Sequence, residues 1–201
     1  MPTVALPALV AHAAAALLIA SVPVAAWFWL RRRFGLAWRD IGVGAAVFVV
    51  FALVLERTLH LYLLQLNPTT AHWLRMPALF VIYGALMAGV FEESGRWLGL
   101  RFLVRKPGDA ATPVAYALGH AGIEAWLVGA ASQAQMVMFG LAANRGELES
   151  RLAASGAAAM VGTIHAMLAQ LSPWLALGAV SERVAAMLIQ FTLTLVVWHA
   201  V

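Results

Sequence analysis

Long uninterrupted runs of apolar residues dominate this chain and limit the folds open to it. A helix that crosses the hydrocarbon core of a bilayer needs ~20 consecutive apolar residues. With 63% hydrophobic and 11% charged residues among 201, the chain has too little polar surface for a water-soluble globule. We therefore predict an all-α polytopic membrane helix bundle of five to six transmembrane helices, forming a single transmembrane domain over residues 1–201. The apolar runs occupy residues 4–30, 41–66, 76–100, 110–143, 156–179 and 184–201.

The run 156–179 allows two interpretations. Pro173 and the many small residues of 156–179 are compatible either with a short span or with a re-entrant segment. Ser181, Glu182 and Arg183 separate this run from 184–201, and Glu182-Arg183 is expected at the start of the last helix.

The charged residues suggest an orientation and exclude some chemistries. Loops rich in lysine and arginine are typically cytoplasmic, and the first apolar run precedes its arginines, the reverse of a signal peptide. We expect the N-terminus outside, in a bacterial cytoplasmic membrane. The net charge of +4 resides in loops, so nucleic acid is not an expected partner, whereas membrane lipid is. The chain has no cysteine, which excludes disulfides and thiolate chemistry. The basic residues concerned are Arg31, Arg32, Arg33 and Arg39, and then Arg101, Arg105 and Lys106.

Ionisable side chains inside the apolar runs are the strongest functional signal, because each costs a few kcal/mol to place in the membrane. Several are four residues apart, which puts both side chains on one helix face. A structural interpretation, in which each pair neutralises itself, is favoured for Glu56 with Arg57 and His60. The spaced pairs are Glu56 and His60, Glu92 and Arg96, and His120 and Glu124.

Helix geometry predicts that Glu92, His120 and Gln190 share one level of the membrane. At 1.5 Å per residue, Glu92 lies roughly 14 Å from Arg101, His120 roughly 16 Å from Asp109, and Gln190 roughly 14 Å from Ser181. A carboxylate and an imidazole at one depth could hold a water between them, with polar atoms roughly 4–6 Å apart. The carboxylate would accept a proton from that water, and Arg96 is expected beside Glu92, keeping it ionised.

Two short motifs resemble a known family. Residues 91–96 read Phe-Glu-Glu-Ser-Gly-Arg, and residues 119–125 read Gly-His-Ala-Gly-Ile-Glu-Ala. Together with Glu182-Arg183 they resemble YhfC-type membrane proteins, which group with the CAAX prenyl and bacteriocin-processing proteases. The resemblance implies a glutamic peptidase acting on a membrane-associated polypeptide, with Glu92 as base, His120 as its partner, and Glu93 and Arg96 as supports.

The sequence departs from this family pattern in its third motif, a late histidine with a polar residue four positions on. Gln190 and Thr194 have the required spacing but include no histidine. We expect them to stabilise the oxyanion, usually a large term in catalysis. Relatives of this type tend to continue for another helix, so the chain looks short at its C-terminus.

A metal site and a non-enzymatic function are the alternatives. His120, Glu124 and Glu92 are a set of donors suited to zinc, but the HExxH order is missing, so no metal cofactor is expected. The same buried charges could serve a non-catalytic binding protein or a proton- or cation-coupled carrier. Carriers often contain inverted repeats, and none is evident here, which favours the enzyme.

Overall fold

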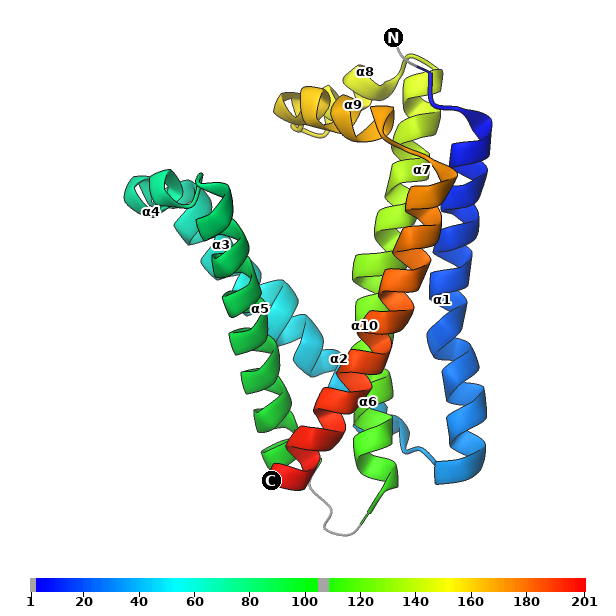
Figure 1. Ribbon diagram of the computed structural model, residues 1–201, viewed down its shortest axis with the longest axis vertical. Helices are drawn as coiled ribbons and strands as arrows, with labels where there is room; N and C mark the ends of the chain where they lie inside the picture. Colours follow the sequence, from blue (N-terminus) through cyan, green and yellow to red (C-terminus); the bar gives the residue numbers. More distant parts are fainter. Residues whose placement is uncertain (1–2, 105–108) are drawn as a thin grey trace. The chain divides into compact units, whose positions relative to one another are not determined.

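The computed structural model describes residues 3–104 and 109–201, and every regular element in these ranges is helical (Figure 1). Five helical stretches are long and apolar enough to cross a membrane. This confirms the predicted polytopic helix bundle, at the lower of the two predicted numbers of spans. Arg105 and Lys106, which entered the prediction of orientation, lie outside the described residues. The candidate spans are Leu6–Phe34, Trp38–Leu66, Pro77–Leu103, Ala111–Asn144 and Pro173–Ala200.

The last candidate span begins earlier than the sequence predicted. Helix α10 (Pro173–Ala200) runs through Ser181, Glu182 and Arg183 without a break, so the break predicted at these residues was wrong. Arg183 forms ion pairs with two carboxylates, which allows the helix to carry its charge. The run 156–179 is divided because Pro173 starts α10 and disfavours helix in the residue before it. What remains of the run is α9 (Val161–Ala169), far shorter than a span.

The second, third and fourth spans contain wide π-helical segments in addition to their α-helical parts. The second span comprises α2 (Trp38–Phe48), η1 (Val49–Glu56), α3 (Arg57–Leu61) and η2 (Tyr62–Leu66). Gly35 lies between this span and α1 (Leu6–Phe34). Its φ of +61° is a left-handed backbone conformation that glycine adopts readily at helix ends. The third span is α5 (Pro77–Leu98) with η3 (Gly99–Leu103), and the fourth is α6 (Ala111–Glu124), η4 (Ala125–Ala130) and α7 (Ala131–Asn144).

The short helices follow local capping rules. In α4 (Pro68–Trp73), proline occupies the first turn and the Asn67 side chain accepts hydrogen bonds from two backbone N–H groups. Helix α8 (Leu148–Ala154) is followed by Gly156 at a φ of +74°.

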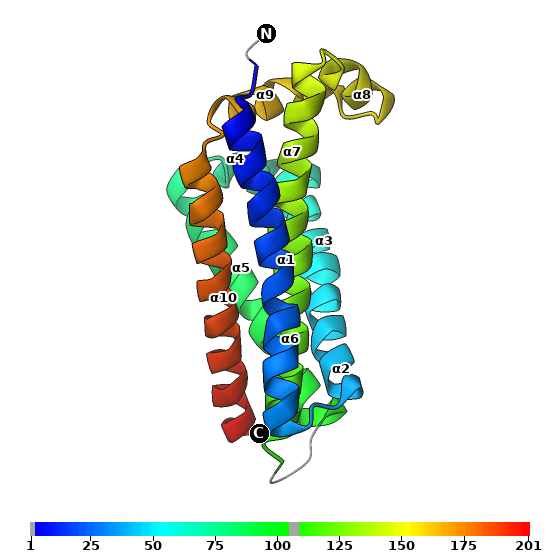
Figure 2. The same ribbon diagram turned by 90° about the vertical axis from the view of Figure 1, so that its right-hand side faces the viewer.

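The chain divides into two compact units. The first comprises Met1–Ala25 and Glu124–Leu188, and the second Ala26–Ile123 and Ile189–Val201. In the first unit α1 and α7 run side by side (Figures 1 and 2). Asn144 bonds the backbone of Val4 through both its amide atoms, and His12 Nδ1 lies 2.6 Å from Gln133 Oε1. These contacts fix the register of the two helices.

In the second unit, α2 and α6 pack so closely that glycine is required at the contact. A Cβ atom on Gly44 would lie 2.1 Å from the Tyr116 carbonyl oxygen, and one on Gly119 would lie 1.9 Å from the Ile41 carbonyl oxygen. Small residues allow this close approach of helices in membranes. Gly119 directly precedes His120, so the same contact fixes the position of that histidine.

Gly44→Ala is therefore expected to lower the free energy of unfolding by about 1–3 kcal/mol, because the methyl group meets backbone that must move. Gly42→Ala, in the same helix, is the matched control, since a Cβ atom on Gly42 would have no other atom within 4 Å among the described residues. Denaturant titration in mixed micelles measures both. Equal stabilities for the two variants would contradict the close α2–α6 contact.

Candidate functional site

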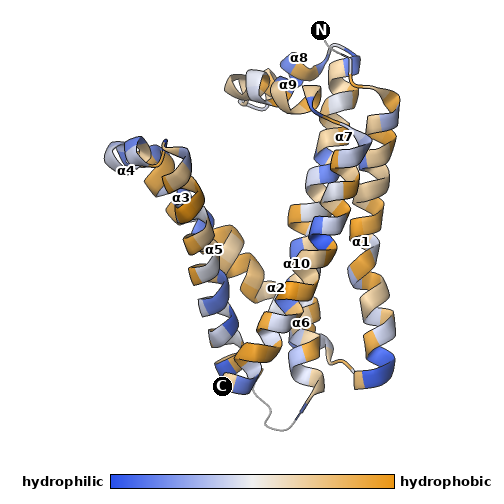
Figure 3. Ribbon diagram, viewed as in Figure 1, coloured by the Kyte–Doolittle hydropathy of each residue, from blue (hydrophilic) through white to orange (hydrophobic). Residues whose placement is uncertain are grey.

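Glu92, His120 and Gln190, from α5, α6 and α10, come together in the second unit. Gln190 Nε2 donates a hydrogen bond of 2.7 Å to Glu92 Oε2. The same carboxylate oxygen lies 3.8 Å from His120 Nε2. In Figure 3, hydrophilic segments, drawn in blue, interrupt the C-terminal half of α5, which carries Glu92. The depth estimate from the sequence thus selected side chains that do meet.

His120 is completely buried and held by aromatic rings rather than by hydrogen bonds. Its ring is edge-on to Phe48 and stacked with Tyr116, with centroids 5.2 and 6.1 Å away. Neither ring nitrogen has a hydrogen-bond partner among the described residues. The 3.8 Å separation from Glu92 is too long for a direct hydrogen bond and slightly shorter than the expected 4–6 Å. The His120 Nε2 atom therefore faces the Glu92 carboxylate, and only a small movement separates the two from hydrogen-bond distance.

Arg96 is fully buried and is the centre of a second set of contacts. Its guanidinium donates to both carboxylate oxygens of Glu93 at 3.1–3.2 Å and to Thr194 Oγ1 at 2.7 Å. It also donates to the Gln190 side-chain oxygen. The sequence had placed Arg96 beside Glu92 at a spacing of four residues. In the structure the carboxylate that binds Arg96 is Glu93, three residues away, and the hydrogen bond to Glu92 comes from Gln190.

Gln190 and Thr194 are the expected oxyanion donors. In the structure they connect Glu92 to the ion pair of Arg96 with Glu93. The Gln190 amide group donates to Glu92 and accepts from Arg96. The Thr194 hydroxyl accepts from Arg96 and donates 2.8 Å to the Gln190 carbonyl oxygen. Both side chains therefore orient the site's charged groups, a role that sequence spacing alone did not reveal.

Glu124 belongs to the first unit, one turn beyond His120 on α6. Its carboxylate accepts a hydrogen bond of 2.9 Å from Arg183 Nη1.

A separate polar cluster connects the second and third spans. His60 Nε2 lies 3.1 Å from Glu56 Oε1, and His60 Nδ1 lies 2.6 Å from the Tyr83 hydroxyl. The pair Glu56 and His60 was expected from its spacing. Tyr83 was missed, because a lone tyrosine in an apolar run carries no signal of its partner.

The fold and the site together define a multi-span helical membrane protein in which Glu92 faces the buried His120, and comparison with known families agrees. Residues 17–201 match the family model described as YhfC intramembrane metalloprotease. The chain belongs to this family. It is 34% identical over 182 residues to the membrane protein YhfC of Bacillus subtilis (strain 168), described as uncharacterized, covering 90% of this chain and 70% of that protein. No solved structure matches.

The family description bears on activity at a coarse level. It supports an intramembrane protease, and its reference to a metal gives no support to the expectation that a cofactor is absent. Glu92 and His120, a carboxylate and an imidazole of the second unit, are donors of types that zinc binds, so they are compatible with the zinc alternative.

Proposed function

We propose that this protein is an intramembrane endopeptidase that hydrolyses a peptide bond of a membrane-associated polypeptide with water activated by Glu92. The observation that carries the proposal is the position of Glu92, which accepts from Gln190 at 2.7 Å and lies 3.8 Å from a buried His120 nitrogen. That nitrogen has no hydrogen-bond partner in the described part of the chain. Titratable pairs held together inside a membrane are expensive to insert, which favours a functional role.

The reaction assigns one proton transfer to each member of the pair. The Glu92 carboxylate accepts a proton from water, and the water oxygen bonds to the peptide carbonyl carbon. His120 donates a proton to the leaving amine as the carbon–nitrogen bond breaks. The products are a new carboxyl terminus and a new amino terminus, and Glu92 then passes its proton to His120, which restores both groups.

The neighbouring residues act on this pair through position and charge. Gln190 holds one oxygen of Glu92, which fixes the direction of the carboxylate. Arg96 holds the oxygen of the Gln190 amide, and Glu93 and Thr194 hold Arg96 in turn. Preorganised groups of this kind require little reorganisation during reaction.

A metal-assisted reaction is the second candidate, favoured by the family description and by the donor set. The His120 ring nitrogens suit ligation, and Glu92 and His120 would contribute ligands to the ion. Zinc bound there would lower the pKa of a water and polarise the peptide carbonyl. A ligating histidine usually donates its other N–H to a second group, and no such partner for His120 occurs among the described residues.

The test is cleavage by the purified chain in proteoliposomes that contain a pool of membrane polypeptides. New termini are identified by mass spectrometry. We expect new termini with the wild type and none with His120→Phe, which keeps the aromatic packing but lacks ring nitrogens. His72→Phe, at an exposed histidine in α4, is the matched control and should cleave normally. Absence of wild-type cleavage, or full cleavage by His120→Phe, would contradict the proposal.

A chelator arm separates the two candidates. The metal-free reaction predicts a rate unchanged within about twofold, since a general base needs no ion. The metal candidate predicts loss of cleavage, recovery on added zinc, and zinc bound stoichiometrically to the wild type but not to His120→Phe, measured by elemental analysis.

A further inference from the structure

Arg57 is a cation inside a candidate membrane span. It lies nine residues before Leu66, roughly 14 Å along the helix from that end of the span. Its guanidinium makes no hydrogen bond or ion pair with the residues that the structure describes. A charge at such a depth is costly unless an opposite charge is supplied.

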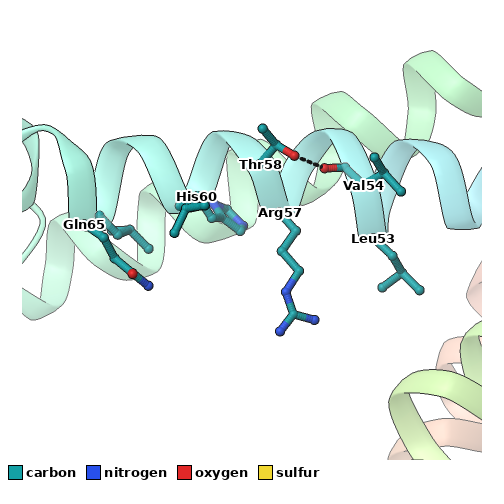
Figure 4. A pocket seen from close by; sticks show the side chains of 8 residues that line it. Leu53, Val54, Arg57, Thr58, His60 and Gln65 are labelled. Atoms are coloured by element: carbon teal, nitrogen blue, oxygen red, sulfur yellow. Dashed lines mark hydrogen bonds between the residues drawn. The ribbon is translucent and has the colours of Figure 1, made fainter. Parts of the chain in front are cut away.

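The nearest carboxylate along the chain is already engaged elsewhere. Glu56 is buried and bonded to His60, which in turn bonds Tyr83. Thr58 directs its hydroxyl to the Val54 carbonyl oxygen at 2.6 Å. In Figure 4 the Arg57 side chain extends away from its helix, with no other labelled side chain directed towards its guanidinium. The counter-charge must therefore come from outside this cluster.

An open groove of about 570 Å³ runs along the helix that carries Arg57, and its lining residues all belong to the second span. Arg57, His60 and Gln65 provide its polar lining, and Leu53, Leu61 and Leu64 line it with apolar surface. The π-helical segments η1 and η2 lie on either side of α3, and such segments are frequent at functional sites.

We propose that this groove binds an anionic phospholipid, with the lipid phosphate at the Arg57 guanidinium and an acyl chain along the leucines. Arginine binds phosphate oxygens through paired N–H donors. A long arginine side chain can also reach from the hydrocarbon region towards the headgroup level. A lipid supplies the missing negative charge together with a chain that matches the apolar lining. The site does not depend on the proposed peptidase activity.

The experiment measures binding of dioctanoyl phosphatidylglycerol to the full chain in detergent, by native mass spectrometry. Arg57→Gln is expected to weaken binding on the order of tenfold or more, because a charge-assisted contact is lost. Arg75→Gln is the matched control, since Arg75 is exposed between α4 and α5 and does not line the groove. It should bind within about twofold of wild type, the precision expected for a distant, independent site.

Three further arms identify the ligand and check the fold. Arg57→Lys retains the charge and should keep most of the binding lost in Arg57→Gln. Dioctanoyl phosphatidylcholine, with no net charge, should bind more weakly than phosphatidylglycerol. Inorganic phosphate should fail to displace the lipid at equal concentration. Equal binding by Arg57→Gln and Arg75→Gln, or displacement by inorganic phosphate, would overturn the proposal.

Discussion

Replacing Arg96 with methionine is expected to lower the free energy of unfolding by about 3–5 kcal/mol, the usual cost of removing one partner from a buried ion pair. The guanidinium is fully buried and bonds Glu93, Gln190 and Thr194. Methionine has a similar length but offers no donors, so these groups lose their partner. The Glu93 side chain is 37% exposed, which places the expected loss toward the lower end of this range.

Arg101→Met is the matched control for this measurement, made by denaturant titration in mixed micelles. Arg101 lies in η3 and donates one hydrogen bond, of 2.6 Å, to the Val201 carbonyl oxygen. Loss of a single hydrogen bond costs about 1 kcal/mol. The double variant Glu93→Gln/Arg96→Met should lose less than the sum of the single variants, because the uncompensated charge is gone. A loss for Arg96→Met no greater than that for Arg101→Met would show that the buried network does not stabilise the fold.

The spans were predictable because the bilayer imposes a length and a composition on them. A predicted helix boundary was wrong where charged residues, which are common in loops, form an ion pair inside a helix. Glu182 and Arg183 resembled a loop between spans, yet Arg183 pairs with Glu124 from a distant part of the chain and the helix continues. A single sequence does not show such tertiary pairing. Pro173 indicated a helix boundary correctly, but the sequence did not show on which side of it the long helix lies.

The candidate site was predictable at the level of depth and residue type. Rise per residue was enough to place Glu92, His120 and Gln190 near one another, because all three reside on long helices. Partner assignment was less accurate. The spacing of Glu92 and Arg96 suggested an ion pair, whereas Arg96 bonds Glu93 and Gln190 bonds Glu92. Which carboxylate binds Arg96 depends on side-chain rotamers that contacts with Gln190 and Thr194 of α10 determine, and α10 is distant in the sequence.

The central claim is that Glu92, rather than Glu93, is the base of a peptidase. Glutamine at 92 keeps the size of the side chain and an oxygen that accepts the hydrogen bond from Gln190, so the fold should persist. It removes the proton acceptor, and a general base contributes about 10²–10⁴ in rate. Glu93 is bonded to Arg96, so Glu93→Gln should perturb the site without removing the base.

The most direct measurement is the single-turnover rate of cleavage by Glu92→Gln and by Glu93→Gln in proteoliposomes. Both rates are compared with that of the wild type, on one polypeptide that the wild type cleaves. The account predicts a loss of about 10²–10⁴-fold for Glu92→Gln and a loss smaller by at least an order of magnitude for Glu93→Gln. A folded Glu92→Gln variant that cleaves at the wild-type rate would contradict the account.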